Sequence, residues 1–265
     1  MAASDQQGAF AGAIFDVDGV LVDSPHERAW AESLRRLMEG SWRDLAGGTS
    51  YRPERFDHDF YQEVMAGKPR MAGAQAALEA FGVPDAEAAA KEYAEDKQAR
   101  VAELIDAGEF HAYPDAIRFF LATKRLGLRV ATASSSRNAR PMLQRIALDQ
   151  LADQLGLDLP APLRGKSLIE AVDADISGRS FPRGKPDPMI FLTAAEELGV
   201  RPAESFVIED ARSGIKAAKA GGMAGLGVAR QGGEELLREA GADLVVSTLD
   251  EVDLDAMREG RLEPK

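Results

Sequence analysis

The stretch Phe15-Asp16-Val17-Asp18-Gly19-Val20-Leu21-Val22-Asp23-Ser24 joins an apolar run to two aspartates that are separated by one residue and followed by a glycine. The short apolar run at residues 13–15 predicts a buried strand. In open α/β sheets, ligands bind beyond the carboxyl ends of the strands, where Asp16 and Asp18 would lie. Such a carboxylate pair attracts a hard divalent cation such as Mg²⁺, and it can divide nucleophilic and acid–base work. Taken alone, Asp-x-Asp-Gly favours a simple turn after a strand. Whether the two aspartates belong to a functional site depends on what the rest of the chain places beside them.

Further apolar runs follow this first strand and alternate with helical patterns. The additional expected strands are residues 128–133, 206–208, 225–228 and 244–246. Apolar residues within 190–198 recur at helical spacing and stop at Gly199, and a second helix is expected over 114–126. This alternation predicts an α/β protein with a Rossmann-like parallel sheet covered by helices on both faces. We expect residues 1–24 and 111–265 to form this core.

The segment between the first strand and residue 111 has helical patterns and no convincing strand. Four of its apolar residues fall on one helical face, namely Trp30, Leu34, Leu37 and Met38. The stretches 74–81 and 86–106 are also rich in helix-forming residues. We therefore expect residues 25–110 to form an all-helical cap domain inserted into the core. Two connections to the core make a hinge, and a hinged cap can close over a site.

A serine-rich segment follows the second expected strand. It reads Ser134-Ser135-Ser136-Arg137-Asn138. Hydroxyls and backbone N–H groups at a strand-to-helix junction can hold phosphate oxygens. Taken alone, serines before a helix more often act as a helix cap.

Two later segments add a cation and a second pair of acids. Lys185 lies between a glycine and a proline, where its ammonium could neutralise an aspartate and a phosphate together. Glu209 and Asp210 end the strand expected at 206–208, and paired acids at a strand end suit a metal ion. Each segment alone fits an ordinary loop or helix cap. Their shared place beyond strand ends, on one edge of a parallel sheet, favours a single phosphoryl-transfer site.

Together these motifs resemble the haloacid dehalogenase (HAD) superfamily of phosphatases and phosphomutases. Asp16-Val17-Asp18-Gly19 is similar to its first motif, Ser134 to its second, Lys185 to its third, and Glu209-Asp210 to its fourth. The resemblance implies that Asp16 forms an aspartyl-phosphate and that Asp18 is the general acid/base. It implies that Ser134 and Lys185 grip the phosphoryl oxygens.

The resemblance also implies a cofactor. Mg²⁺ would be held by the Asp16 side chain, the Asp18 backbone carbonyl and Asp210, with Glu209 close to the ion or ligating it. Residue type does not distinguish Mg²⁺ from Mn²⁺, because both suit carboxylate ligands.

Within the superfamily the chain is most similar to the β-phosphoglucomutase-like branch with a helical cap. The segment from Asp23 to Trp30 resembles the linker that carries a substrate-side histidine, here His26, and Gly67-Lys68-Pro69-Arg70 resembles a cap loop whose arginine binds phosphate. Lys97 falls near a cap lysine that contacts substrate. The resemblance implies that seven residues bind substrate: His26, Arg70, Lys97, Ser135, Ser136, Arg137 and Asn138.

Simpler interpretations of the cap residues stay open at this stage. His26 could be a surface histidine, and Lys97 could belong to the solvated face of a charged helix. The segment ending at Arg70 could be only a turn between helices. A sugar-phosphate phosphomutase is the leading hypothesis, a phosphatase acting on a sugar phosphate or similar metabolite is the alternative, and a non-enzymatic phosphate-binding protein is the third.

Composition limits the partners. The chain has 265 residues, a formal net charge of −12 and no cysteine. The acidity argues against nucleic acid and anionic membranes as partners, and an anionic substrate would need local positive charge at its site. The family resemblance implies a small phosphorylated metabolite, a sugar phosphate or a similar compound, as the partner. The missing cysteines and an N-terminal segment 1–10 without signal-peptide features predict a cytoplasmic protein. The charged segment 251–265 is expected to be a mobile tail, and the oligomeric state is left open.

Overall fold

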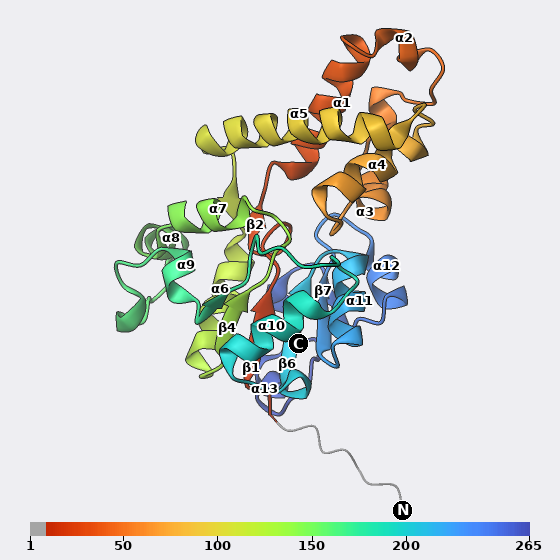
Figure 1. Ribbon diagram of the computed structural model, residues 1–265. Helices are drawn as coiled ribbons and strands as arrows, with labels where there is room; N and C mark the ends of the chain where they lie inside the picture. Colours follow the sequence, from red (N-terminus) through yellow and green to blue (C-terminus); the bar gives the residue numbers. More distant parts are fainter. Residues whose placement is uncertain (1–8) are drawn as a thin grey trace, which may run out of the picture. The chain divides into compact units, whose positions relative to one another are not determined.

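The computed structural model describes residues 9–265 and divides the chain into two compact units (Figure 1). Unit 1 comprises Met1–Val22 and Ala112–Lys265, and unit 2 comprises Asp23–His111. Most of the segment 1–10, where we expect no signal peptide, lies outside the described residues. The two chain segments that join the units, β2 (Val22–Asp23) and β3 (His111–Ala112), pair with each other as a two-stranded sheet.

The described part of unit 1 is built on a six-stranded sheet in the order β5-β4-β1-β6-β7-β8, in which all neighbouring strands are parallel. The strands are β1 (Gly12–Phe15), β4 (Arg129–Thr132), β5 (Ala174–Asp175), β6 (Ser205–Glu209), β7 (Ala224–Val228) and β8 (Leu244–Val246). The five strands expected from the sequence are all present, and the predicted α/β fold class is confirmed. Sequence analysis missed β5 because two residues are too short to show a period.

Helices cover both faces of this sheet. The longer segments are α6 (Pro114–Arg125), α7 (Ala139–Arg145), α8 (Leu148–Leu155), α10 (Met189–Leu198), α11 (Arg212–Ala220) and α12 (Glu234–Glu239), and the shorter ones are η2 (Ala161–Leu163), α9 (Leu168–Ala171), η3 (Pro202–Glu204), η4 (Leu249–Glu251) and α13 (Leu254–Arg258). Side chains of β1 alternate between the two layers: Ile14 packs with α10 and α11, while the Phe15 ring contacts the Phe119 and Phe120 rings of α6. Both residues are fully buried. Among residues 9–265, the structure has no helix both long enough and apolar enough to cross a membrane.

Unit 2 is helical. It contains α1 (His26–Glu39), α2 (Arg43–Ala46), η1 (Pro53–Arg55), α3 (His58–Val64), α4 (Arg70–Ala80) and α5 (Ala86–Asp106). The apolar stripe predicted on α1 is buried against α4 and α5. Trp30 of α1 and Tyr93 of α5 lie edge to face with their ring centres 4.8 Å apart, and the Tyr93 hydroxyl donates to the Trp30 carbonyl at 2.9 Å. The buried phenol is therefore satisfied, and the two helices are fixed in register.

The C-terminal segment corrects one prediction. Residues 251–265 fold back on unit 1 instead of forming a mobile tail. The Asp253 side chain accepts hydrogen bonds from the Asp255 and Ala256 N–H groups and starts α13. Val252 and Met257 are each 1% exposed. Ala256 is also buried, and three buried side chains together with a capped helix outweigh the charged composition that suggested a solvated tail.

Candidate active site

The predicted core residues meet at one edge of the sheet in unit 1. Asp16 follows β1, Ser134 follows β4, and Glu209 ends β6, and these three strands are neighbours. Phe15 pairs with both Thr132 and Ile208, so the three strands reach the edge at the same level. Parallel pairing therefore brings side chains that are far apart in sequence into contact.

Lys185 is the centre of this cluster. Its Nζ lies 2.6 Å from Asp16 Oδ1 and 2.5 Å from Glu209 Oε1, and it lies 4.9 Å from the centre of the Phe191 ring. The side chains of Lys185, Asp16 and Glu209 are 2%, 9% and 1% exposed. A buried ammonium shared by two carboxylates fixes the position of both acids.

The cluster carries more negative than positive charge. Burial raises the pKa of Asp16 to about 8; Lys185 opposes this rise, while Glu209 and Asp18 add to it. Burial, followed by repulsion from Glu209 and Asp16, also holds the pKa of Asp210 well above its ordinary value. Burial would lower the pKa of Lys185, but its two carboxylate partners outweigh this and hold the pKa above the ordinary value. The lysine therefore stays charged, and the acids need further positive charge to be ionised together.

The structure fits a divalent cation at this place. Oxygen atoms of Asp16, Glu209 and Asp210 all lie within 4.8 Å of one another. Lys185 neutralises one of these three carboxylates, so a hard dication would balance the other two. The Asp18 side chain is not part of this group of oxygens, and the backbone role that the sequence resemblance implies for Asp18 stays a prediction.

Two glycines let the acids lie directly against the backbone. A Cβ atom at Gly19, whose φ is +79°, would lie 2.0 Å from Asp210 Oδ2. A Cβ atom at Gly214 in α11 would lie 1.9 Å from the Glu209 carboxylate carbon. Any side chain at these positions would displace an acid of the cluster, so both positions require glycine.

Ser134 links the serine-rich segment to the Asp18 carboxylate. Its side chain is buried, and its hydroxyl donates to Asp18 Oδ2 at 3.1 Å while accepting the Ser136 N–H at 3.1 Å. The Ser134 N–H in turn donates to the Ser177 hydroxyl at 3.3 Å. Ser177, which sequence analysis missed, thus supports the residue that orients Asp18.

The remaining residues of the serine-rich segment make local polar contacts. Ser135 and Arg137 are exposed, and the Ser136 hydroxyl accepts the Asn138 N–H at 3.1 Å. Arg137 Nη2 lies 3.5 Å from the Ser180 hydroxyl. Their substrate-binding roles stay predictions.

Two of the substrate residues predicted in unit 2 form a buried pair. His26 is 7% exposed and Lys97 is 5% exposed, so the surface-histidine and solvated-face interpretations were wrong. Lys97 Nζ lies 3.1 Å from His26 Nδ1 and 4.9 Å from the centre of the Trp30 ring. Lys97 and His26 are therefore within hydrogen-bonding distance of each other. Arg70 begins α4, is exposed and donates from Nη1 to Gln98 Oε1 at 2.6 Å.

Comparison with known proteins identifies the family. Residues 10–222 match the haloacid dehalogenase-like hydrolases. The chain belongs to this family. The resemblance predicted from the motifs is therefore confirmed, and the protein is an enzyme of the HAD phosphotransferase type.

Relatives of this HAD enzyme include phosphatases and mutases. It is 30% identical to a phosphorylated carbohydrates phosphatase of Thermotoga maritima over 211 residues, covering 79% of this chain and 81% of the relative. It is 31% identical to a β-phosphoglucomutase of Mycobacterium bovis over 255 residues, covering 90% of each. Among solved structures, the β-phosphoglucomutase of Pyrococcus sp. strain ST 04 matches with a TM-score of 0.67 and 31% identity, covering 94% of this chain and 99% of that one.

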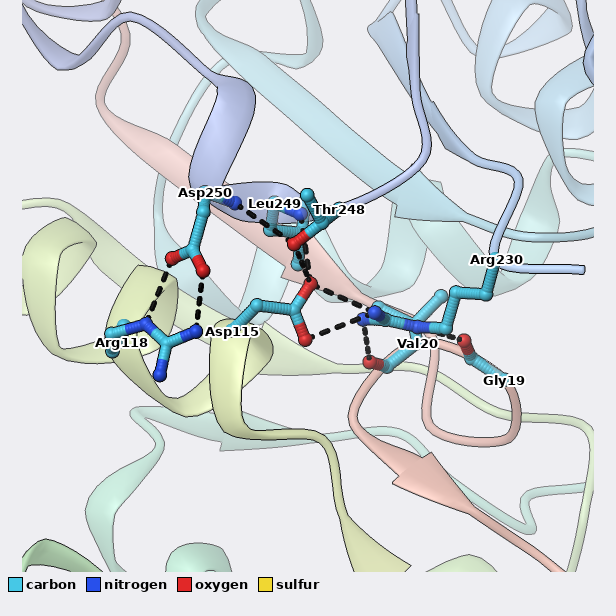
Figure 2. A network of polar contacts seen from close by, with 8 residues as sticks. All are labelled: Gly19, Val20, Asp115, Arg118, Arg230, Thr248, Leu249 and Asp250. Carbon is cyan, nitrogen blue, oxygen red and sulfur yellow. Dashed lines mark hydrogen bonds and ion pairs between the residues drawn. The ribbon is translucent and has the colours of Figure 1, made fainter. Parts of the chain in front are cut away.

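The HAD enzyme also has an ion pair beside the site, between Asp115 and Arg230, which the sequence patterns did not predict (Figure 2). Asp115 lies in the first turn of α6, where acids are common in any helix, so its position alone does not indicate a special role. Arg230 lies two residues beyond the end of β7, next to β6 in the sheet. Its signal in the sequence is therefore a cation just beyond a strand end, the same kind of position that holds the predicted acids.

This pair gives the HAD enzyme a pH-dependent contribution to stability. Burial would raise the pKa of Asp115, but hydrogen bonds from Arg230, the Leu249 N–H and the Thr248 hydroxyl outweigh it, so the pKa lies below 3.8. A depressed carboxyl pKa stabilises the folded state above the unfolded pKa, and this contribution is lost as the pH falls through the folded value.

We expect Asp115→Asn to lower the free energy of unfolding by about 3 kcal/mol at pH 7, because it leaves the Arg230 charge without its partner. Urea unfolding of both proteins from pH 7 to pH 3 measures the difference. It should stay constant down to about pH 4 and shrink below that. A difference that grows on acidification would contradict the depressed pKa.

Proposed function

We propose that this HAD enzyme transfers a phosphoryl group through an aspartyl-phosphate at Asp16, and that it isomerises a sugar phosphate as a β-phosphoglucomutase does. The observation that carries the proposal is the buried cluster in which Lys185 holds Asp16 beside Glu209 and Asp210. Such an arrangement presents one carboxylate oxygen to a phosphorus atom with fixed positive charge close by. A cytoplasmic location and a small phosphorylated metabolite as partner are part of this proposal.

In the first half-reaction, an oxygen of Asp16 attacks the phosphorus. The bond between phosphorus and the ester oxygen breaks, and protonated Asp18 gives its proton to that oxygen. Lys185 stabilises the negative charge of the transferring group. The hydroxyl of Ser134, which donates to Asp18 Oδ2, holds the acid/base carboxyl in place.

In the second half-reaction, Asp18 takes a proton from the acceptor hydroxyl, whose oxygen attacks the aspartyl-phosphate and frees Asp16. The acceptor is a second sugar hydroxyl in a mutase and water in a phosphatase. Dividing the transfer in this way replaces one difficult step with two easier ones.

Mg²⁺ would keep Asp16 ionised and would separate its charge from that of the incoming phosphate. Asp16 and Asp210 are the favoured direct ligands. Glu209 accepts from Lys185 with Oε1 and from the Ala211 N–H at 3.0 Å with Oε2, so both of its oxygens already have donors. We therefore assign Glu209 the role of holding Lys185, with its charge close to the ion.

A substrate panel separates mutase from phosphatase. The enzyme is mixed with Mg²⁺, β-glucose 1-phosphate and a trace of the corresponding bisphosphate, and both glucose 6-phosphate and inorganic phosphate are measured. We expect glucose 6-phosphate to form faster than phosphate is released. Rapid release of phosphate without glucose 6-phosphate would rule out the mutase and support the alternative, which the similarity to the Thermotoga phosphatase favours.

Arg70 gives a second test. If His26, Arg70 and Lys97 bind the substrate, Arg70→Ala should lower kcat/KM for the mutase reaction by about 10- to 100-fold, because an arginine–phosphate contact is worth about 1.5–3 kcal/mol. Arg36→Ala is the matched control, because Arg36 is an exposed arginine of unit 2 that pairs with Asp96. Equal activity of the two variants would remove Arg70 from the substrate site.

A further inference from the structure

The turn that follows Asp18 is held by an arginine from a distant segment of unit 1. Arg230 Nε donates to the Gly19 carbonyl at 3.1 Å, and its Nη2 donates to the Val20 carbonyl at 3.1 Å (Figure 2). These are the two peptide carbonyls immediately after Asp18. The guanidinium thus fixes the direction of the chain just where it leaves the acid/base residue.

The arginine is itself anchored. Its Nη1 donates to both oxygens of Asp115, at 2.9 and 2.8 Å, and its Cζ lies 3.9 Å from the centre of the Tyr113 ring. Asp115 also accepts from the Leu249 N–H at 2.8 Å and from the Thr248 hydroxyl at 2.9 Å. The Arg230 and Asp115 side chains are only 13% and 8% exposed. A planar guanidinium can make this set of contacts, whereas a lysine ammonium cannot match its fork geometry.

The held turn touches two acids of the site. Asp18 precedes the turn, and its carboxylate accepts from Ser134 on the other side. Gly19 has no room for a side chain because Asp210 lies against it. A change in the direction of the Gly19 peptide would therefore move Asp18 and Asp210 relative to each other.

We propose that Arg230, anchored by Asp115, is a positioning residue that sets the Asp18–Gly19 turn and so aligns Asp18 for proton transfer. The inference rests on the proposed role of Asp18 as acid/base. Arg230 touches neither Asp16 nor Lys185 in the contacts described, so it acts through the backbone and not on the phosphoryl group.

The test compares three changes with one control. Arg230→Lys and Arg230→Gln remove the two-carbonyl contact, and the double variant Arg230→Gln/Asp115→Asn removes it without leaving a lone buried charge. Arg118→Gln is the control, since Arg118 also joins α6 to the η4 region, through Asp250, and makes no contact with the turn (Figure 2). Each protein is assayed for kcat and KM with a sugar phosphate and Mg²⁺. Hydrogen exchange is followed at the Gly19, Leu21 and Val22 N–H groups, which bond within the turn.

We expect each Arg230 variant, including the double variant, to lose about 10- to 100-fold in kcat with KM changed less than about threefold. Exchange at the turn should rise at least tenfold, and Arg118→Gln should match the wild type in both measurements. Wild-type kcat in the double variant would overturn the proposal, since Asp115 and Arg230 would then matter only through their charges. Unchanged exchange at the turn would overturn it independently of any activity. Failure of the wild type to turn over any phosphate ester would instead overturn the proposed function.

Discussion

Replacing Asp16 by asparagine is expected to lower kcat on a sugar phosphate by about 10,000-fold or more, since an amide of the same shape cannot attack phosphorus. Lys185 keeps its contact with Glu209 in this variant, so the cluster should stay assembled. Steady-state release of product from the wild type and the variant, with saturating Mg²⁺, measures the effect. Asp255→Asn, which changes a surface carboxylate paired with Arg258, is the matched control and should retain full activity.

The unfolding temperature of Asp16→Asn shows whether a loss of activity reflects lost chemistry or misfolding. A carboxyl whose pKa is raised from 3.8 to about 8 on folding opposes folding increasingly as the pH rises through that interval. The amide is free of this penalty. At pH 8 without divalent cations, the variant should therefore unfold at a temperature at least as high as the wild type does. An inactive variant with a clearly lower unfolding temperature would instead indicate that Asp16 is needed for folding.

Asp18→Asn should give a different kinetic pattern. Turnover of a sugar phosphate should fall by about 100- to 10,000-fold, because its leaving oxygen needs a proton. An aryl phosphate with a good leaving group needs no proton in the first half-reaction, whereas the second half still needs a base. We therefore expect a burst of nitrophenol close to one equivalent per enzyme from p-nitrophenyl phosphate, followed by very slow turnover.

The size of the burst decides whether Asp18 acts as proposed. With the same substrate, the wild type should continue to release nitrophenol at a steady rate after the first turnover. Equal loss of the burst and of steady-state turnover would mean that Asp18 does not act chiefly in proton transfer. Asp243→Asn is a suitable control, since Asp243 is a half-exposed carboxylate paired with Lys219 beyond the catalytic cluster.

The strands and the core site were predictable because both follow from local patterns. Apolar runs marked β1, β4, β6, β7 and β8, and parallel pairing requires their carboxyl ends to meet. Acids, hydroxyls and a cation that follow those runs are therefore expected to lie close to one another in the folded protein. The edge strand β5 was not predicted because its two residues are too few to show a period. Helix α13 was not predicted because its three apolar residues are interspersed with charged ones.

The supporting contacts were less predictable, because they depend on tertiary structure. Arg230 reaches Gly19 across 211 positions of sequence, and neither residue shows this in its local pattern. Lys97 lies in a charged helical stretch, yet the turn of α5 directs it toward Trp30 and His26. Whether a lysine is buried depends on the helix that packs against it. The charged composition of this stretch alone favours a solvent-exposed position for Lys97.

The most direct test of the account is a search for the phosphorylated residue. The enzyme is mixed with labelled sugar phosphate and Mg²⁺, quenched in acid within milliseconds, digested and examined by mass spectrometry. We expect a hydroxylamine-sensitive phosphoryl group on Asp16 that is present in the wild type and absent from Asp16→Asn. Full turnover with no phosphorylated residue, or with the label on another side chain, would contradict it.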